Sequence, residues 1–129
     1  MKNTRTRVEG ADPILSVANM AAAVRYYVDV LGFENAPWGD EAFTSVSRDR
    51  AGIYLCAGEY QGRPGAWVWV GVEDAMMLYE ELKASGARLR HAPRNYPWAF
   101  EFHVEDLDGN VLRVGSEPQA NLPYEEWMA

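Results

Sequence analysis

Two tryptophans, Trp67 and Trp69, alternate with valines in the segment AWVWVGV at residues 66–72. Successive side chains of a β-strand point to opposite faces, so the indoles share one face and the valines share the other. The β-branched valines suit the face that packs under a helix. Indoles on the other face could stack on a flat ligand, each contact adding about 0.5–1.5 kcal/mol beyond burial. Packing within a dimer interface is the alternative use of this apolar surface.

A second alternating segment, FEFHVE at residues 100–105, brings polar groups to the same region. We expect Phe102 and Val104 to lie in the core. Glu101 and His103 are then predicted to line the open face beside the indoles, which would suit an aromatic ligand that carries positive charge. His103 could also act as a general base, although a hydrogen-bonded strand histidine is the more common role.

Two further tryptophans, Trp38 and Trp98, each follow a proline next to a predicted strand. Either indole could close the mouth of a binding cleft, and packing at the rim of the sheet is the alternative. Cys56 is the only cysteine, which excludes a disulfide within the chain. No histidine is near Cys56 in the sequence, so we expect a buried thiol and not a nucleophile.

The elements that would position these side chains occur twice along the chain. Residues 43–58 and 100–115 align at an offset of 57, with Asp and Gly in the middle of each segment, where a hairpin turn needs them. The identical pairs are Phe43/Phe100, Asp49/Asp106, Gly52/Gly109, Leu55/Leu112 and Gly58/Gly115.

Each repeat also predicts one helix. Asn19 and Asp74 are good helix N-caps, because a short side-chain oxygen accepts a free backbone N–H. Apolar residues follow at helical spacing through residues 20–31 and 75–85. A glycine comes after each of these segments, where a left-handed C-cap is favoured.

The predicted fold class is α+β, with two βαβββ modules forming a curved mixed sheet around a cleft. Module 1 is expected at about residues 11–58 and module 2 at about 66–116, within a single domain of residues 1–129. Residues 117–129 are expected to form a tail that packs on the surface or on a partner subunit. The expected strands cover residues 12–18, 33–38, 42–48, 52–57, 66–72, 88–94, 98–105 and 110–115.

Composition narrows the function classes. The chain has 129 residues, of which 48% are hydrophobic and 24% charged, as in a globular protein. Its formal net charge of −7 argues against nucleic acid as a partner and suits a neutral or cationic one. The longest apolar run, residues 66–70, is too short to span a membrane, and no secretory signal is visible, so we expect a cytoplasmic location.

Two stretches carry a family resemblance. SVANMAAAVRYYVDVLGF (residues 16–33) and VEDLDGNVLRVG (residues 104–115) resemble the first strand–helix and the closing hairpin of the vicinal oxygen chelate superfamily, which includes glyoxalases, bleomycin resistance proteins and dioxygenases. The resemblance implies that its enzymes hold a divalent metal through four side chains. By register, these positions are here occupied by Asp12, Cys56, Trp67 and Arg113.

This set does not suit a metal ion, so no metal and no cofactor are expected. Trp67 cannot coordinate, and Arg113 is a permanent cation that would repel the ion. Arg113 is instead expected to form a salt bridge with Asp12 across the floor of the cleft.

The resemblance is closest to the metal-free bleomycin-resistance-like group. It implies a homodimer that sequesters an aromatic, cationic antibiotic or a related small molecule without turnover, with no catalytic residues. The expected ligand-binding residues are Trp67, Trp69, Trp98, Trp38, Glu101, His103, Arg113 and Asp12. One alternative is an enzyme of the same superfamily, a glyoxalase-like lyase or dioxygenase with an atypical metal site. Another is an accessory ligand-binding protein of a biosynthetic pathway.

Overall fold

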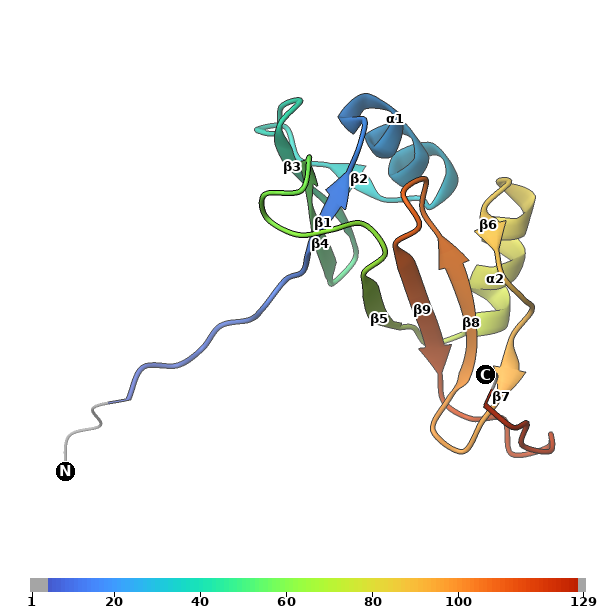
Figure 1. The fold of residues 1–129 in the computed structure, drawn as a ribbon. Coiled ribbons are helices and arrows are strands. Elements are labelled where there is room, and N and C mark those ends of the chain that lie inside the picture. Colours follow the sequence, from blue (N-terminus) through green and yellow to red (C-terminus); the bar gives the residue numbers. More distant parts are fainter. Residues whose placement is uncertain (1–4, 128–129) are drawn as a thin grey trace.

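The computed structural model describes residues 5–127, and both halves of the chain follow the same order of elements (Figure 1). None of the helices in this range is both long and apolar enough to cross a bilayer. The first half contains β1 (Ile14–Val17), α1 (Met20–Arg25), the π-helical turn η1 (Tyr26–Val30), β2 (Glu34–Asn35), β3 (Phe43–Arg48) and β4 (Ala51–Ala57). The second half contains β5 (Trp67–Gly71), α2 (Ala75–Ala84), β6 (Arg88–Leu89), β7 (Arg94–Asn95), β8 (Phe100–Glu105) and β9 (Val111–Ser116).

The predicted α+β class and the repeat are confirmed by the sheet topology. The first half, module 1, forms a sheet of order β1-β4-β3-β2, and the second half, module 2, forms a sheet of order β5-β9-β8-β6 in which β7 also pairs with β8. In each module the first strand runs parallel to the last one, whereas the other pairs are antiparallel. Each module therefore builds its own mixed sheet, in which the first strand, β1 or β5, lies at one edge.

Three predicted elements are shorter or divided. The expected strand at 88–94 is replaced by the two short strands β6 and β7, and the expected strand at 33–38 is reduced to β2. Prolines at 37 and 93 explain part of this, because proline has no N–H to donate to a sheet. The first helix changes to a π-helical turn at Tyr26.

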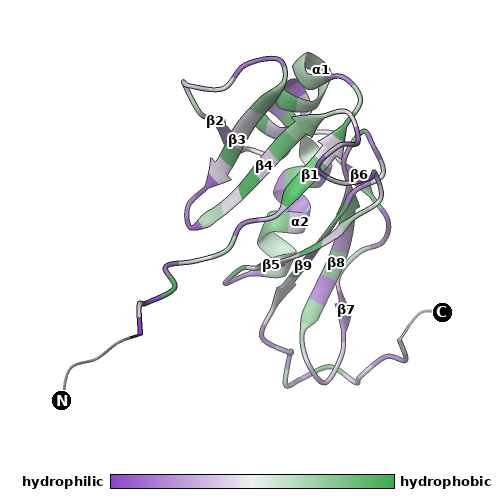
Figure 2. Cartoon of the chain, turned by 60° about the vertical axis from the view of Figure 1, so that its left-hand side comes forward, coloured by the Kyte–Doolittle hydropathy of each residue, from purple (hydrophilic) through white to green (hydrophobic). Residues whose placement is uncertain are grey.

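One hydrophobic core joins the helix-facing sides of the two sheets. The predicted N-caps are present: the side chains of Asn19 and Asp74 each accept a backbone N–H at 3.0 Å. Hydrophobic and polar residues alternate along the strands (Figure 2), which leaves the opposite faces of both sheets pointing outward. The core takes side chains from both modules, including Leu15, Tyr27 and Leu55 from the first and Phe102, Val104 and Leu112 from the second.

The turn between β8 and β9 fastens the modules together. Asp106 is buried and accepts a hydrogen bond from the Tyr27 hydroxyl at 2.9 Å. Asn110, also buried, donates from Nδ2 to the backbone oxygen of Ser16 at 3.1 Å. Both bonds cross from module 2 to module 1, so this turn fixes how the outward faces of the two sheets are oriented.

Candidate functional site

The two indoles of β5 lie where the alternation predicts. Trp67 and Trp69 are 50% and 52% exposed, whereas Val68 and Val70 pack against the core. β5 is an edge strand, and its outward face carries these two large apolar side chains, which are about half exposed. An apolar surface of this kind on an edge strand indicates a contact with a ligand or another chain.

Glu101 and His103 share this face but are not open to solvent, so the prediction that they line an exposed surface is wrong. Both side chains are 0% exposed. The Trp67 ring meets the His103 ring edge-on at 5.1 Å between centroids, and the Trp98 indole Nε1 donates to Glu101 Oε1 at 2.6 Å. The indoles thus cover a polar layer, and a ligand would meet the rings first.

Glu101 is the centre of that layer. Arg113 donates to it from Nε at 2.7 Å and from Nη2 at 3.1 Å, and the His103 Nε2 lies 2.9 Å from the same carboxylate. Burial alone would raise the pKa of Glu101, but the hydrogen bonds from Arg113, His103 and Trp98 outweigh burial and hold that pKa below its ordinary value. Burial lowers the pKa of His103 and outweighs its bond to Glu101, so the pair is a neutral imidazole beside a carboxylate.

Arg113 therefore pairs with Glu101, and the predicted salt bridge to Asp12 is wrong. Asp12 is exposed and lies beside Gly52 in module 1. The expectation assumed that the outward faces of both modules of one chain meet in a cleft. The shared core instead holds the modules together through their helix-facing sides, which places Asp12 and Arg113 in different surroundings.

Two guanidinium groups already occupy the indole faces. The Arg113 Cζ lies 5.5 Å from the ring centroid of Trp69, and the Arg90 Cζ lies 5.2 Å from that of Trp67. Arg90 is also paired with Glu105 at 3.0 Å. Both indoles are thus in positions where a flat cation is favourably bound.

Trp38 belongs to a separate aromatic cluster on module 1. Its ring stacks on Phe43 at 6.3 Å, and Phe43 stacks on Tyr54 at 5.3 Å. Phe43 is half-buried on the outward face, whereas its repeat partner Phe100 is buried in the core. Cys56, opposite Phe43 in the sheet, is buried as expected.

A fifth tryptophan, Trp127, joins the site from the C-terminal tail. Its ring centroid is 5.8 Å from that of Trp98 and 5.8 Å from that of His103, and the Arg113 Cζ lies 4.5 Å from the Trp127 ring. The sequence predicted only that the tail packs on the surface or on a partner subunit. The available signal was a tryptophan in a short segment that follows the last strand, but its target on the sheet depends on long-range contacts.

One buried amide holds the tail in place. Asn95 donates from Nδ2 to the backbone oxygens of Gln119 and Leu122, and its Oδ1 accepts the Gln119 N–H at 2.8 Å. The backbone oxygen of Asn95 also accepts the N–H of Glu125 at 2.7 Å. Asn95 therefore makes four hydrogen bonds with the tail, and these bonds hold the tail against module 2 near the indoles.

We expect Asn95→Ala to release the tail. The substitution removes three part-buried hydrogen bonds, each worth about 0.5–1.5 kcal/mol, so the total loss should be about 1–3 kcal/mol. Hydrogen–deuterium exchange of residues 117–127 should become faster, and the free energy of unfolding should fall by that amount. Asn121→Ala, an exposed amide of the same tail, serves as the control. Equal exchange in both variants would contradict the role given to Asn95.

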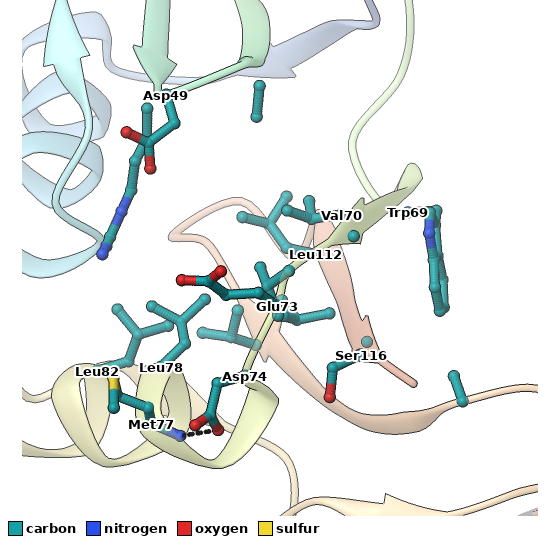
Figure 3. A pocket seen from close by; sticks show the side chains of 18 of the residues that line it. Asp49, Trp69, Val70, Glu73, Asp74, Met77, Leu78, Leu82, Leu112 and Ser116 are labelled. Carbon is teal, nitrogen blue, oxygen red and sulfur yellow. Dashed lines mark hydrogen bonds between the residues drawn. The ribbon is translucent and has the colours of Figure 1, made fainter. Parts of the chain in front are cut away.

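A groove of about 1220 Å³ opens on the other side of β5 (Figure 3). Val70, Leu78 and Leu112 form its apolar wall, and Figure 3 shows Trp69 pointing away from them. The carboxylates of Glu73 and Asp74 stand near its helix end. Trp69 and Trp98 also line the groove, so the groove adjoins the outward face of β5 and offers a ligand a second place to bind beside the indoles.

The four positions at which the family resemblance implies a metal are dispersed or unsuitable. Cys56 and Asp12 lie on module 1. Trp67 and Arg113 lie on module 2, in the neighbouring strands β5 and β9. Across residues 5–127, no three side chains of the types His, Cys, Asp and Glu converge on one point. These four residues do not fit a resident metal ion.

Comparisons with solved structures give the same fold. The bleomycin-binding protein from bleomycin-producing Streptomyces verticillus, complexed with copper(II)-bleomycin, matches with a TM-score of 0.74 and 27% sequence identity over 89% of this chain and 100% of that chain. A bleomycin-binding protein complexed with bleomycin matches with a TM-score of 0.71 and 20% identity, over 85% and 99% of the two chains. TnmS3, an antibiotic binding protein from Streptomyces sp. CB03234, matches with a TM-score of 0.71 and 19% identity, over 89% and 100%.

Sequence comparison identifies the family. A comparison with curated protein sequences gave no significant match. The family profile described as the glyoxalase/bleomycin resistance protein/dioxygenase superfamily matches residues 10–114. This match covers most of the chain, including both modules. The chain therefore belongs to the glyoxalase/bleomycin resistance protein/dioxygenase superfamily, and bleomycin-binding proteins are among its structural neighbours.

Proposed function

We propose that this protein binds and sequesters a flat, aromatic and cationic small molecule of the antibiotic type on the indole face of module 2, without turnover. We define the indole face as the surface made by Trp67, Trp69, Trp98 and Trp127. The observation that carries the proposal is the contact of three of these indoles, those of Trp67, Trp69 and Trp127, with the guanidinium groups of Arg90 and Arg113.

These internal contacts imitate a bound ligand. A guanidinium group is planar, delocalised and positively charged, and it stacks on aromatic rings. Trp67 and Trp69 already accept such groups on their faces. A cationic heteroaromatic ligand would stack in the same way, either on top of the arginines or in their place.

Charge and similarity support the same class of ligand. The formal net charge of −7 attracts cations over a long range, although Glu101 and Glu105 are locally neutralised by their arginine partners. A similar solved structure, at 27% identity, is a bleomycin-binding protein.

Sequestration needs a dissociation constant of about 1 μM or lower, which is a binding free energy of about −8 kcal/mol. Stacking alone provides too little of that, so ionic contacts and burial of the ligand must contribute the rest.

A homodimer would complete the site. In one chain the aromatic cluster of module 1 and the indole face of module 2 both point away from the shared core. A second copy could bring Trp38 of one subunit toward the indole face of the other and enclose the ligand between them. Light scattering coupled to size-exclusion chromatography should give twice the chain mass of 14.5 kDa.

The test is a titration of the metal-stripped protein with bleomycin and other cationic aromatic antibiotics. We expect saturable binding by calorimetry together with quenching of tryptophan fluorescence. Trp67→Ala and Trp69→Ala should each weaken binding about tenfold, since the lost stacking and burial amount to about 1–2 kcal/mol. No binding across the panel would remove the antibiotic-binding proposal.

Two more variants locate the ligand. Trp38→Ala should weaken binding only if module 1 contributes to the same site. Met77→Ala removes a 69% exposed side chain that lines the groove on the other side of β5, and it should leave the affinity unchanged. A loss in Met77→Ala with no loss in Trp67→Ala, whose indole is not among the groove-lining side chains, would move the binding site to the groove.

A further inference from the structure

The only two histidines in the sequence lie against each other. His91 follows β6 and His103 is on β8, and their ring centroids are 4.7 Å apart with the planes at 67°. Each ring has one buried nitrogen without a hydrogen-bond partner, Nε2 in His91 and Nδ1 in His103. Leaving a buried polar group unpaired costs about 1–3 kcal/mol, so the pair needs an explanation.

The hydrogen bonds of each ring determine which nitrogen carries the proton. The His103 Nε2 lies 2.9 Å from a Glu101 oxygen, and an ionised carboxylate only accepts hydrogen bonds. Nε2 of His103 must therefore carry the hydrogen, so Nδ1 holds a lone pair in the neutral ring. The His91 Nδ1 lies 2.8 Å from the backbone oxygen of Ala92, which also only accepts. Nδ1 of His91 is the donor, and its Nε2 holds a lone pair.

The two unpartnered nitrogens are thus both acceptors and cannot satisfy each other. A ring that donates one N–H to a carboxylate or a backbone carbonyl and offers its other nitrogen is the usual state of a metal-binding histidine. Metal–nitrogen bonds of about 2.0–2.1 Å place two imidazole centres on one ion roughly 4.5–5.2 Å apart for bond angles between about 90° and 109°. The observed 4.7 Å lies within that range.

We propose that His91 and His103 together bind one divalent transition-metal ion, with Cu²⁺ held most tightly. Imidazole is a good ligand for copper, nickel and zinc, and copper binds most strongly of these. The nearby cations are neutralised, because Arg113 is paired with Glu101 and Arg90 with Glu105. The bond to Glu101 also fixes the orientation of the His103 ring, as a carboxylate partner does for a metal-binding histidine.

This site is separate from the metal positions that the family resemblance implies, none of which is a histidine here. It has two protein ligands, so water would complete the coordination. His91 as a residue is only half-buried, but its Nε2 is covered, so the ion would enter from that side as the His91 ring moves. The Trp67 and Trp127 rings cover the His103 side, at 5.1 Å and 5.8 Å between centroids.

The test uses tag-free, metal-stripped protein carrying Cys56→Ser, so that copper does not react with the thiol. Titration with Cu²⁺ alone should give one ion per chain with a dissociation constant of about 1 μM or lower. Electron paramagnetic resonance should show coupling to imidazole nitrogen. His91→Asn and His103→Gln should each weaken binding at least tenfold, with folding checked by circular dichroism. Asp12→Asn, at a position of the family metal site, is the matched control and should bind like the parent protein.

A measurement on the unaltered rings covers the case in which His103→Gln does not fold. Nitrogen NMR of the imidazoles should show the two tautomers deduced above, and adding Zn²⁺ should shift Nε2 of His91 and Nδ1 of His103 together. Absence of Cu²⁺ uptake by the parent protein overturns the proposal. So does uptake that neither histidine substitution changes, or a Zn²⁺ titration that leaves both ring nitrogens unshifted.

Discussion

Replacing Glu101 by glutamine should lower the free energy of unfolding at pH 7 by about 3 kcal/mol, because a buried carboxylate that serves several donors is lost. Glu101 is fully buried and accepts bonds from Arg113, His103 and Trp98. A glutamine amide offers one accepting oxygen, and its NH₂ group would face a donor. The neutral amide also leaves the partly buried Arg113 guanidinium without a counter-ion.

The pH dependence gives this prediction a second observable. The pKa of Glu101 in the folded protein is below its ordinary value of 4.5. The stability that its ionised form provides is therefore fully present above pH 4.5 and is lost as the pH falls through the lower folded value. Urea unfolding of metal-stripped protein should show a large difference between wild type and Glu101→Gln at pH 7 that shrinks toward zero in acid.

The control lies four residues further along the same strand. Glu105 pairs with Arg90 at 3.0 Å, but its side chain is 34% exposed. A partly exposed ion pair contributes about 0–1 kcal/mol, so Glu105→Gln should have a small effect. If the two glutamine variants lose equal stability at pH 7, Glu101 does not hold the layer beneath the indoles together.

The contrast between these glutamates shows what the sequence could predict. Alternation along a strand is a local property, and it correctly put Glu101, His103, Trp67 and Trp69 on one face. Burial on that face depends on side chains that arrive from elsewhere. Trp98 enters from the loop before β8, and Trp127 comes from the tail. Neither contact follows from periodicity, so the polar layer was predicted to be open.

The partner of Arg113 shows the limit of a register argument. Alignment of the repeats put Arg113 in the last strand of module 2, where β9 indeed places it opposite His103 and next to Trp69. Predicting Asp12 as its partner also required knowledge of which faces of the two modules meet. The strand patterns of each module show which face is apolar, but they do not show that both apolar faces enter one shared core.

The repeat itself supports a second large effect, at Asp106. We expect Asp106→Asn to lower the free energy of unfolding by about 3 kcal/mol, because each buried donor left unpaired costs about 1–3 kcal/mol. Asp106 Oδ1 accepts the N–H groups of Asp108 and Asn110 at 2.8 and 3.0 Å. Its Oδ2 accepts the Tyr27 hydroxyl and the Asn110 amide, both at 2.9 Å. An asparagine can accept at only one of these two ends.

The repeat also provides the matched control, because Asp49 occupies the same position in the turn of module 1. Asp49 is exposed and has a backbone φ of 50°, a conformation that asparagine tolerates well. Asp49→Asn should therefore change stability by no more than about 0.5 kcal/mol. Tyr27→Phe, which removes only the Tyr27–Asp106 bond between the modules, should cost about 1–2 kcal/mol. Denaturant unfolding measures all three values.

The order of the three effects decides what the β8–β9 turn does. We expect the loss in the free energy of unfolding to be largest for Asp106→Asn, intermediate for Tyr27→Phe and near zero for Asp49→Asn. This order would mean that only the turn of module 2 holds the two modules together. Equal small costs at Asp49 and Asp106 would mean that both copies act only as local turns. The orientation of the indole face relative to module 1 would then depend on the shared apolar core alone.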